Sequence, residues 1–138
     1  MMGYDGDGGP ATSAKIERPA TIYVDNANNK LYFTEEEACR LRGVSLTTNV
    51  ISTISGDGTC LFTGDGGLAT SAQLKKPRGL WLDPNSNIYI GTEDSCVVRR
   101  IDAITGIITT FAGTGSVLAA VKAALKPAHE QADIAAVK

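Results

Sequence analysis

Acidic side chains are the residues of this 138-residue chain whose types and spacing could support chemistry, because paired carboxylates bind cations or exchange protons. Asp5 and Asp7 alternate with glycine, as in a calcium-binding loop. Such a loop needs an acidic residue at its twelfth position, and counting from Asp5 that position is Ile16. We therefore expect no metal here, and we expect both carboxylates to bind backbone amides of their own loop.

Other residues that support catalysis are scarce. The chain has one histidine, His129, and no Cys-X-X-Cys pair, so neither a zinc site nor a histidine-based acid–base site is expected. A single histidine near the end of a chain is usually exposed to solvent. We predict that the chain is not an enzyme and that it uses no metal and no cofactor.

A second group of acidic residues suggests binding rather than catalysis. These candidate binding residues are Glu35, Glu36, Glu37, Glu93 and Asp94. Gathered on one surface, their carboxylates would attract a protein partner with basic groups. The nearby basic residues are Lys15, Arg18, Lys75, Lys76 and Arg78. Because these mix the charge, a solvated rim is the competing interpretation.

RNA binding is a minor alternative. The net charge of −2 indicates no wide basic surface, which nucleic-acid-binding proteins normally have. The candidate phosphate contacts are Arg40, Arg42, Arg99 and Arg100. Arg42 and Arg99 occupy equivalent positions in a repeat, so a structural role in pairing between the repeated units is the simpler prediction.

The elements that must position these residues occur twice. Residues 6–14 read GDGGPATSA and residues 64–72 read GDGGLATSA, which are identical at eight of nine positions. Matching residues follow at an offset of 58, which becomes 57 after the turn at residues 26–30. A repeat of this length is typical of solenoids, propellers and arrays, and it tolerates a one-residue change within a turn.

Each repeat is predicted to contain four short strands. Runs rich in β-branched and aromatic residues alternate with turn sequences, such as DNANN at 25–29 and DPNSN at 83–87. The predicted strands are 20–24, 30–34, 39–46 and 50–55 in the first repeat, and 78–83, 87–91, 96–102 and 107–112 in the second. Four-stranded units repeated along a chain are typical blades of a β-propeller.

The second repeat carries a family resemblance. Residues 64–74 read GDGGLATSAQL, and PRGLWLD, NIYI, VVRRID and TGIITTFAGTG follow. These strings resemble NHL repeats, over about residues 6–115 of the chain. The first repeat departs mainly in turns and exposed positions, for example at Gly43 in place of Arg100. The resemblance implies an all-β fold of two four-stranded antiparallel blades in an incomplete propeller ring.

The predicted domains are residues 1–115, with blades at about 6–58 and 64–115, and an Ala-rich tail at 116–138. The tail is expected to be α-helical at 117–126 and 128–137, with a break at Pro127. Two blades leave apolar surface uncovered, because propellers contain about four to eight. That surface is expected to belong to a longer propeller, to pair with other copies of the chain, or to be covered by the tail.

The resemblance implies a non-catalytic protein-interaction or scaffold module within a larger NHL propeller. The expected partner is a protein, or another copy that binds through the open blade edges. The alternative is a fragment of a lactonase- or lyase-like propeller enzyme whose catalytic residues lie outside this chain. No run approaches the roughly 20 apolar residues that span a membrane, and no signal peptide is visible, so no membrane association or compartment is predicted.

The three cysteines are an odd number. Cys39 and Cys96 occupy equivalent positions in the two repeats, so they are expected to lie farther apart than the roughly 7 Å between Cα atoms that a disulfide permits. We expect free, half-buried thiols.

Overall fold

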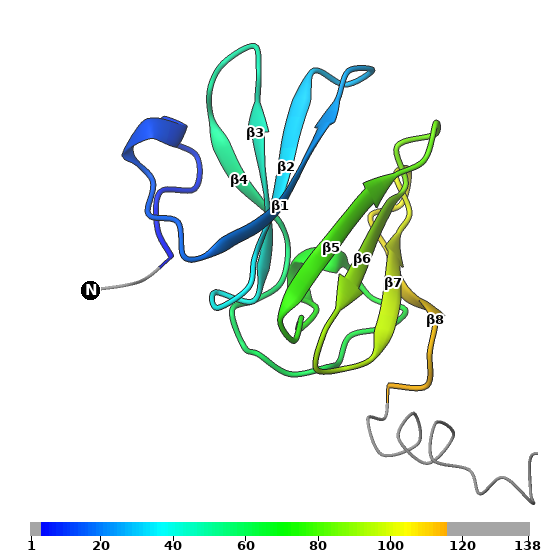
Figure 1. The fold of residues 1–138 in the computed structure, drawn as a ribbon. Coiled ribbons are helices and arrows are strands. Elements are labelled where there is room, and N and C mark those ends of the chain that lie inside the picture. The colour runs from blue at the N-terminus through cyan, green and yellow to red at the C-terminus, as the bar shows by residue number, and fades with distance from the viewer. Residues whose placement is uncertain (1–3, 116–138) are drawn as a thin grey trace, which may run out of the picture.

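The computed structural model describes residues 4–115, which fold into two four-stranded antiparallel sheets and contain no α-helix (Figure 1). Sheet 1 consists of β1 (Pro19–Asp25), β2 (Lys30–Glu35), β3 (Arg40–Ser45) and β4 (Ile51–Ser55). Sheet 2 consists of β5 (Pro77–Leu82), β6 (Ile88–Thr92), β7 (Val97–Ile101) and β8 (Ile108–Ala112). Strand order follows the sequence in both sheets, so the predicted all-β fold with two four-stranded units is confirmed. The predicted tail helices lie outside the described residues.

Aspartates close the first hairpin turn of each sheet. Asp25 accepts hydrogen bonds from the amides two and three residues further along the chain, at 3.1 and 3.3 Å. Its counterpart Asp83 accepts from the amides two and four residues further along, at 2.9 and 3.0 Å. Aspartate favours turns because its short carboxylate reaches nearby amides. The same contact forms in turns of different length, which explains why the one-residue difference between the repeats is tolerated there.

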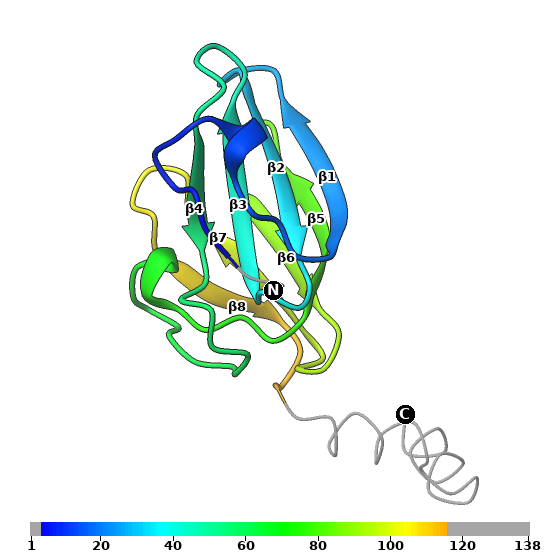
Figure 2. The same cartoon turned by 90° about the vertical axis from the view of Figure 1, so that its left-hand side faces the viewer.

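The two sheets stack face to face (Figures 1 and 2). We call the face of sheet 1 that contacts sheet 2, and the equivalent face of sheet 2, the forward face. The opposite face of each sheet is its rear face. Side chains alternate between these faces along every strand. The forward face of sheet 1 includes Tyr23, Tyr32 and Ile54. It packs against the rear face of sheet 2, where Leu82 and Ile90 are buried. The hydrophobic core of the described residues therefore lies between the sheets.

Each Gly-Asp-Gly-Gly segment runs beside the fourth strand of its own sheet. The amides of Gly8 and Gly66 donate to carbonyls of β4 and β8, both at 2.8 Å. The first segment lies on the outer side of sheet 1, and the second lies between the sheets, where the Ser55 hydroxyl donates to the Ala69 carbonyl at 2.9 Å (Figures 1 and 2). One 3₁₀ turn follows in each copy, at η1 (Ala11–Ser13) and η2 (Ala69–Ser71).

A close return of the chain explains why the repeated motif is so similar in both copies. Gly6 and Gly64 have φ values of +92° and +96°. A Cβ atom at these positions would lie 2.7 and 2.8 Å from the Cα atoms of Ala14 and Ala72. Glycine alone satisfies both requirements without strain. The two ends of GDGG-x-ATSA therefore approach so closely that the first position of the motif requires glycine.

The expectation of free thiols is wrong for two of the three cysteines. Cys39 and Cys60 form a disulfide, with their Cα atoms 5.3 Å apart. The distance argument applies to Cys39 and Cys96, but Cys60 lies in the crossover between the sheets, which passes close to the turn after β2. The bond therefore ties sheet 1 to that crossover. Cys96 is a free, exposed thiol.

Candidate functional site

An arginine of the third strand contacts the aspartate of the Gly-Asp-Gly-Gly segment in both sheets. We call these contacts the Arg–Asp latches. Arg42 Nη2 lies 2.9 Å from Asp7 Oδ1, and Arg99 Nη2 lies 2.7 Å from Asp65 Oδ1. Both arginines are fully buried, and a buried cation requires a compensating partner. The latches therefore fix each Gly-Asp-Gly-Gly segment to its own sheet.

Each latch arginine also binds the backbone at both ends of its segment. Arg99 donates to the carbonyls of Thr63 and Gln73, at 3.0 and 2.9 Å. Arg42 donates to the two equivalent carbonyls in the first repeat, at 3.2 and 3.5 Å. Five donors in a planar fork suit arginine to this arrangement. Lysine would keep the charge but lose the several directed hydrogen bonds.

Hydrogen bonds keep the latch carboxylates ionised. Partial burial raises the pKa of Asp65, but hydrogen bonds from Thr110 and Arg99 lower the pKa by more, so it lies below its ordinary value. The pKa of Asp7 is lowered in the same way, with the Tyr4 hydroxyl among the donors that outweigh burial. The expectation that Asp7 binds amides of its own loop is corrected, because its carboxylate binds the side chains of Arg42, Thr53 and Tyr4.

The predicted role of Arg42 and Arg99 in pairing between the units is also corrected. Each binds the segment that belongs to its own sheet. Since both guanidinium groups are fully buried, a nucleic-acid phosphate has no access to them. Arg40 and Arg100 are partly exposed, and both already bind an oxygen of the chain.

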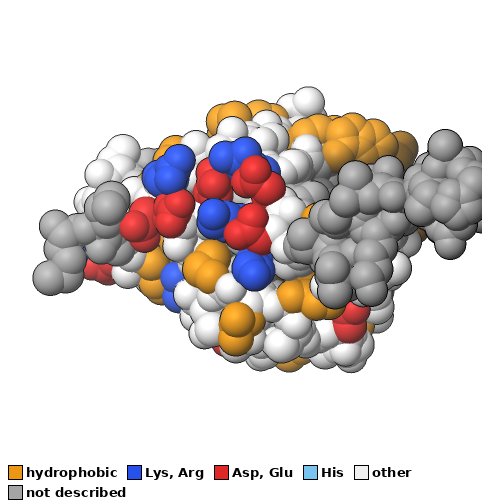
Figure 3. Space-filling model, turned by 60° about the horizontal axis from the view of Figure 1, so that its bottom comes forward, with side chains coloured by type: hydrophobic (Ala, Val, Ile, Leu, Met, Phe, Trp, Pro, Cys, Tyr) orange, Lys and Arg blue, Asp and Glu red, His pale blue; other side chains and the backbone are white. Residues whose placement is uncertain are grey.

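Four of the five predicted binding residues come together at one end of the molecule, beside the turns that follow β2 and β6. Every one of these carboxylates is paired with a basic side chain. The pairs are Glu36–Arg78 and Glu93–Arg78, both at 3.2 Å, Glu37–Arg18 at 2.8 Å and Asp94–Lys76 at 3.5 Å. Figure 3 shows acidic and basic side chains interspersed at this end. The surface therefore has mixed charge rather than an acidic patch.

The fifth predicted residue, Glu35, is not part of this surface. Its side chain is fully buried and accepts a hydrogen bond from Arg42 at 3.1 Å and one from the Glu17 amide at 2.7 Å. Strand β2 extends one residue beyond its predicted end and includes Glu35. The strand alternation then turns this carboxylate toward Arg42. Arg42 consequently has two carboxylate partners, whereas Arg99 has one.

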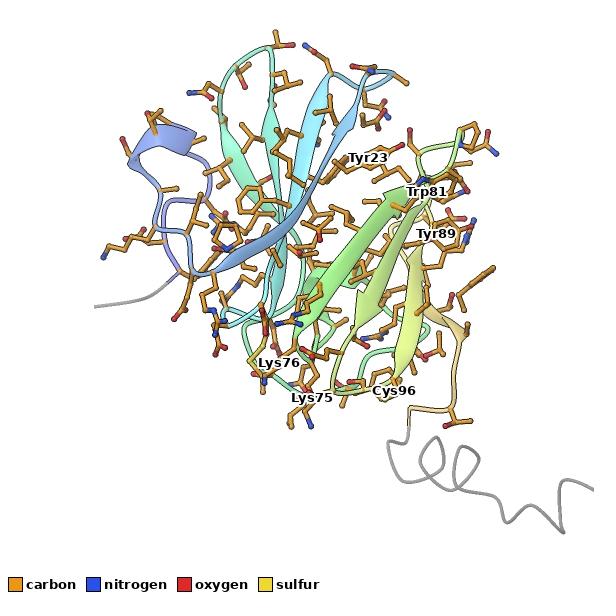
Figure 4. All side chains as sticks on the ribbon, in the orientation of Figure 1. Tyr23, Lys75, Lys76, Trp81, Tyr89 and Cys96 are labelled. Carbon is orange, nitrogen blue, oxygen red and sulfur yellow. A yellow bond between two sulfur atoms is a disulfide. The ribbon has the colours of Figure 1, made fainter. Side chains whose placement is uncertain are left out.

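Equivalent residues differ in exposure because, within residues 4–115, no second sheet covers the rear face of sheet 1 or the forward face of sheet 2. On the rear face, Val24 of sheet 1 is 43% exposed, whereas its counterpart Leu82 is 3% exposed. On the forward face the order is reversed. Trp81 is 54% exposed, whereas its counterpart Tyr23 lies between the sheets and donates to the Leu82 carbonyl at 3.4 Å (Figure 4).

The two uncovered faces have distinct chemistry. The rear face of sheet 1 forms an apolar groove of about 460 Å³, here called the rear groove, lined by residues that include Ile16, Pro19, Ala20, Ile22, Leu31 and Phe33. The forward face of sheet 2 carries the aromatic patch, which consists of Trp81, Tyr89 and Phe111. Ring centroids are 6.1 Å apart for Trp81–Tyr89 and 5.1 Å apart for Tyr89–Phe111. Exposed apolar faces of this kind mark interaction surfaces.

A cleft of about 510 Å³ also opens between the sheets, beside the turns at the end opposite the charged surface. Its lining includes Lys30, Tyr32 and Asp102. Burial and the charge of Asp25 raise the pKa of the Tyr32 hydroxyl above its ordinary value. Within residues 4–115, no three histidine, cysteine or acidic side chains group to hold a metal ion, and no helix is long and apolar enough to cross a membrane. His129 lies outside this range.

Sequence reasoning missed the latches and the disulfide, although signals for both are present. Asp7 and Asp65 match between the repeats, as do Arg42 and Arg99, and the recurrence of the same acidic and basic residues in both repeats indicates a contact rather than a solvated loop. For the disulfide, the useful signal is that Cys60 lies in the crossover that directly follows the sheet containing the turn of Cys39. That Cys60 lies beside Cys39 is evident only from the path of the folded chain.

Comparisons with known proteins indicate a distant relationship to teneurins. No family model matches the chain. The chain is 29% identical over 98 residues to teneurin-1 of Gallus gallus, 30% over 105 residues to teneurin-3 of Mus musculus and 30% over 103 residues to teneurin-4 of Homo sapiens. These matches cover 68–72% of this chain but only 4% of each relative. The chain therefore corresponds to a small part of those proteins.

A solved structure shares the fold. It is the crystal structure of a protein of unknown function from Bacteroides thetaiotaomicron VPI-5482, with a TM-score of 0.61 and 17% sequence identity. The similarity covers 75% of this chain and 24% of that one. At this identity the comparison concerns the fold alone.

Proposed function

We propose that the two sheets are neighbouring blades of an NHL-type β-propeller and that the chain is a non-catalytic interaction module of a larger propeller scaffold. Three features support this proposal. The sheets follow each other in sequence and stack face to face. Each is closed by an Arg–Asp latch. The matched segment is a small part of the teneurins and of the Bacteroides protein, as a blade pair of a larger scaffold would be.

The observation that carries the proposal is the exposure of equivalent residues. The rear face of sheet 2 is buried by sheet 1, whereas no sheet covers the same face of sheet 1, where Ile22 and Val24 are exposed. Repeat proteins bury apolar faces only against neighbouring repeats. The rear groove and the aromatic patch are therefore surfaces for further sheets. The charged end is a weaker candidate, because a partner there would compete with existing ion pairs, such as Glu37 with Arg18.

A chain with more sheets tests this proposal. Three copies of residues 6–112 would be joined in one polypeptide by the natural crossover, residues 56–63. We expect small-angle scattering to show a compact, closed particle, and we expect a melting temperature above that of the single chain, because the open faces become covered. A string of independent two-sheet units with an unchanged melting temperature would contradict the proposal. The matched control carries Ile22→Lys in every copy, which should prevent closure.

A further inference from the structure

We infer that the aromatic patch of one chain docks into the rear groove of a second copy, so that chains associate head to tail. This inference rests on the proposed function, because it assumes that the sheets stack as equivalent units. It names the partner of both open faces, which is another molecule of the same chain. The contact would repeat, between chains, the contact that already joins the two sheets within one chain.

The interface within the chain is the template for this contact. There, the forward face of sheet 1 covers the rear face of sheet 2, with Tyr32 and Ile54 against Leu82 and its buried neighbours. A polar contact also crosses the interface, since the Thr34 hydroxyl lies 3.1 Å from the Arg78 carbonyl. The template shows that a forward face of this repeat fits a rear face of this repeat.

The same molecule has an uncovered forward face, on sheet 2, and an uncovered part of a rear face, on sheet 1. On the forward face of sheet 2, Trp81, Tyr89 and Phe111 stand where Tyr23, Tyr32 and Ile54 stand in sheet 1. On the rear face of sheet 1, Ile22 and Val24 stand where Leu80 and Leu82 stand in sheet 2. Ile22 and Phe111 are 65% and 63% exposed. Aromatic side chains that enter an apolar groove are the usual centres of binding energy.

The copies of the interface differ in their polar residues. Arg78, which binds Glu36 across the template interface, is replaced by Ala20 on the rear face of sheet 1. Glu93, the counterpart of Glu36, already binds Arg78 of its own chain. Head-to-tail docking would therefore form no equivalent ion pair. The association should be driven by apolar burial and should not weaken when the salt concentration is raised.

Head-to-tail contacts use two different surfaces, so they close into a ring or continue as a filament. A ring of roughly four to eight sheets, as in propellers, would need two to four chains. Closure would leave neither the rear groove nor the aromatic patch exposed. The expected product in solution is therefore a small closed oligomer.

Sedimentation of the full chain over a range of concentrations tests the inference, with the fluorescence of Trp81 as a local reporter. Trp81 is the one tryptophan of the sequence, so its emission reports on the aromatic patch. We expect mass to rise with concentration while the emission shifts to shorter wavelength and quenching by acrylamide falls. Ile22→Lys and Phe111→Lys should each abolish this association. Ile104→Lys is the control, because Ile104 is 95% exposed in a turn outside both faces.

Mixing the two defective variants distinguishes head-to-tail contacts from symmetric ones. The Ile22→Lys chain keeps its patch and the Phe111→Lys chain keeps its groove, so the mixture should form a dimer that grows no further. An Ile22→Lys or Phe111→Lys chain that still associates alone would overturn the inference. A wild-type monomer at all concentrations would also overturn it, whether Trp81 is accessible or is shielded by residues 116–138. In that case the three-copy chain would still decide the proposed function separately.

Discussion

Arg99 and Asp65 lie 34 positions apart in the chain, and their side chains meet at 2.7 Å beneath the second Gly-Asp-Gly-Gly segment. The same contact recurs between Arg42 and Asp7. Each pair joins the first segment of a repeat to its third strand, so each repeat is held together by a contact within itself. This organisation explains how a repeated sheet keeps its shape although one of its faces is uncovered.

Removing the charge of a latch carboxylate should destabilise the chain. Asp65→Asn leaves the buried Arg99 without a carboxylate and should lower the free energy of unfolding by about 2 kcal/mol. Asp7→Asn should cost less, about 1 kcal/mol, because Glu35 still pairs with Arg42. Urea unfolding monitored by circular dichroism measures both. The surface control Asp94→Asn should change stability by less than about 0.5 kcal/mol, and equal losses in all three variants would contradict the role of the latches.

Stability should fall in acid. Because the folded pKa of Asp65 is below its ordinary value, its stabilising contribution is complete above the unfolded pKa of about 3.9 and is lost as the pH falls through the folded pKa. Asp7 contributes with the same sign. The free energy of unfolding, measured at several pH values from neutral to below 4, should decrease most below pH 4. The Asp65→Asn variant should show a shallower decrease, and a profile parallel to the wild type would disprove this assignment.

Reduction of the disulfide should destabilise sheet 1. The bond between Cys39 and Cys60 closes a loop with a sequence separation of 21, which corresponds to about 3 kcal/mol in the chain-entropy estimate. The Cys60→Ser variant should therefore unfold at lower urea concentration than the wild type, and a reductant should have no further effect on it. Cys96→Ser is the control and should match the wild type. Three free thiols in the denatured, unreduced protein would show that the bond does not form.

Glycine should be essential where the chain turns from the fourth strand into the crossover. At Gly56, φ is +96° and a Cβ atom would lie 2.4 Å from the Cys39 carbonyl oxygen. Gly56→Ala should cost more than the roughly 1–2 kcal/mol of left-handed strain alone, because the backbone must also shift. At Gly8, φ is +83° but nothing lies within 4 Å, so Gly8→Ala should cost only the strain. Thermal unfolding of both variants measures the difference, which should disappear if the close contact at Gly56 is absent.

Local signals in the sequence were sufficient for much of the fold. The turn aspartates, the β-branched runs and the duplicated Gly-Asp-Gly-Gly motif predict eight strands, and the structure has them near the predicted positions. Strand ends differ from the predicted positions. Because β2 extends one residue further than predicted, Glu35 is a buried strand residue rather than an exposed binding residue. A residue beyond a strand points to solvent, whereas a residue within it takes the alternation of the strand.

Contacts between distant segments were harder to predict. The sequence indicates acidic turns with basic residues nearby, but it does not show that Arg78 of β5 pairs with both Glu36 and Glu93. The Arg78–Glu36 pair depends on how the two sheets stack, and the sequence positions of these two residues do not predict the stacking. The unequal exposure of Val24 and Leu82 likewise follows from position in the stack, since both occupy equivalent places in the repeat.

The central claim is that the outer faces of the two sheets are equivalent to the faces that already meet between them. The most direct measurement is a crystal structure of the three-copy chain, at the point where sheet 2 of one copy is followed by sheet 1 of the next copy. We predict that Trp81 there occupies the place that Tyr23 has in the present interface, with Ile22 and Val24 buried against it. Sheets that meet through other faces, or that remain apart, would contradict the account.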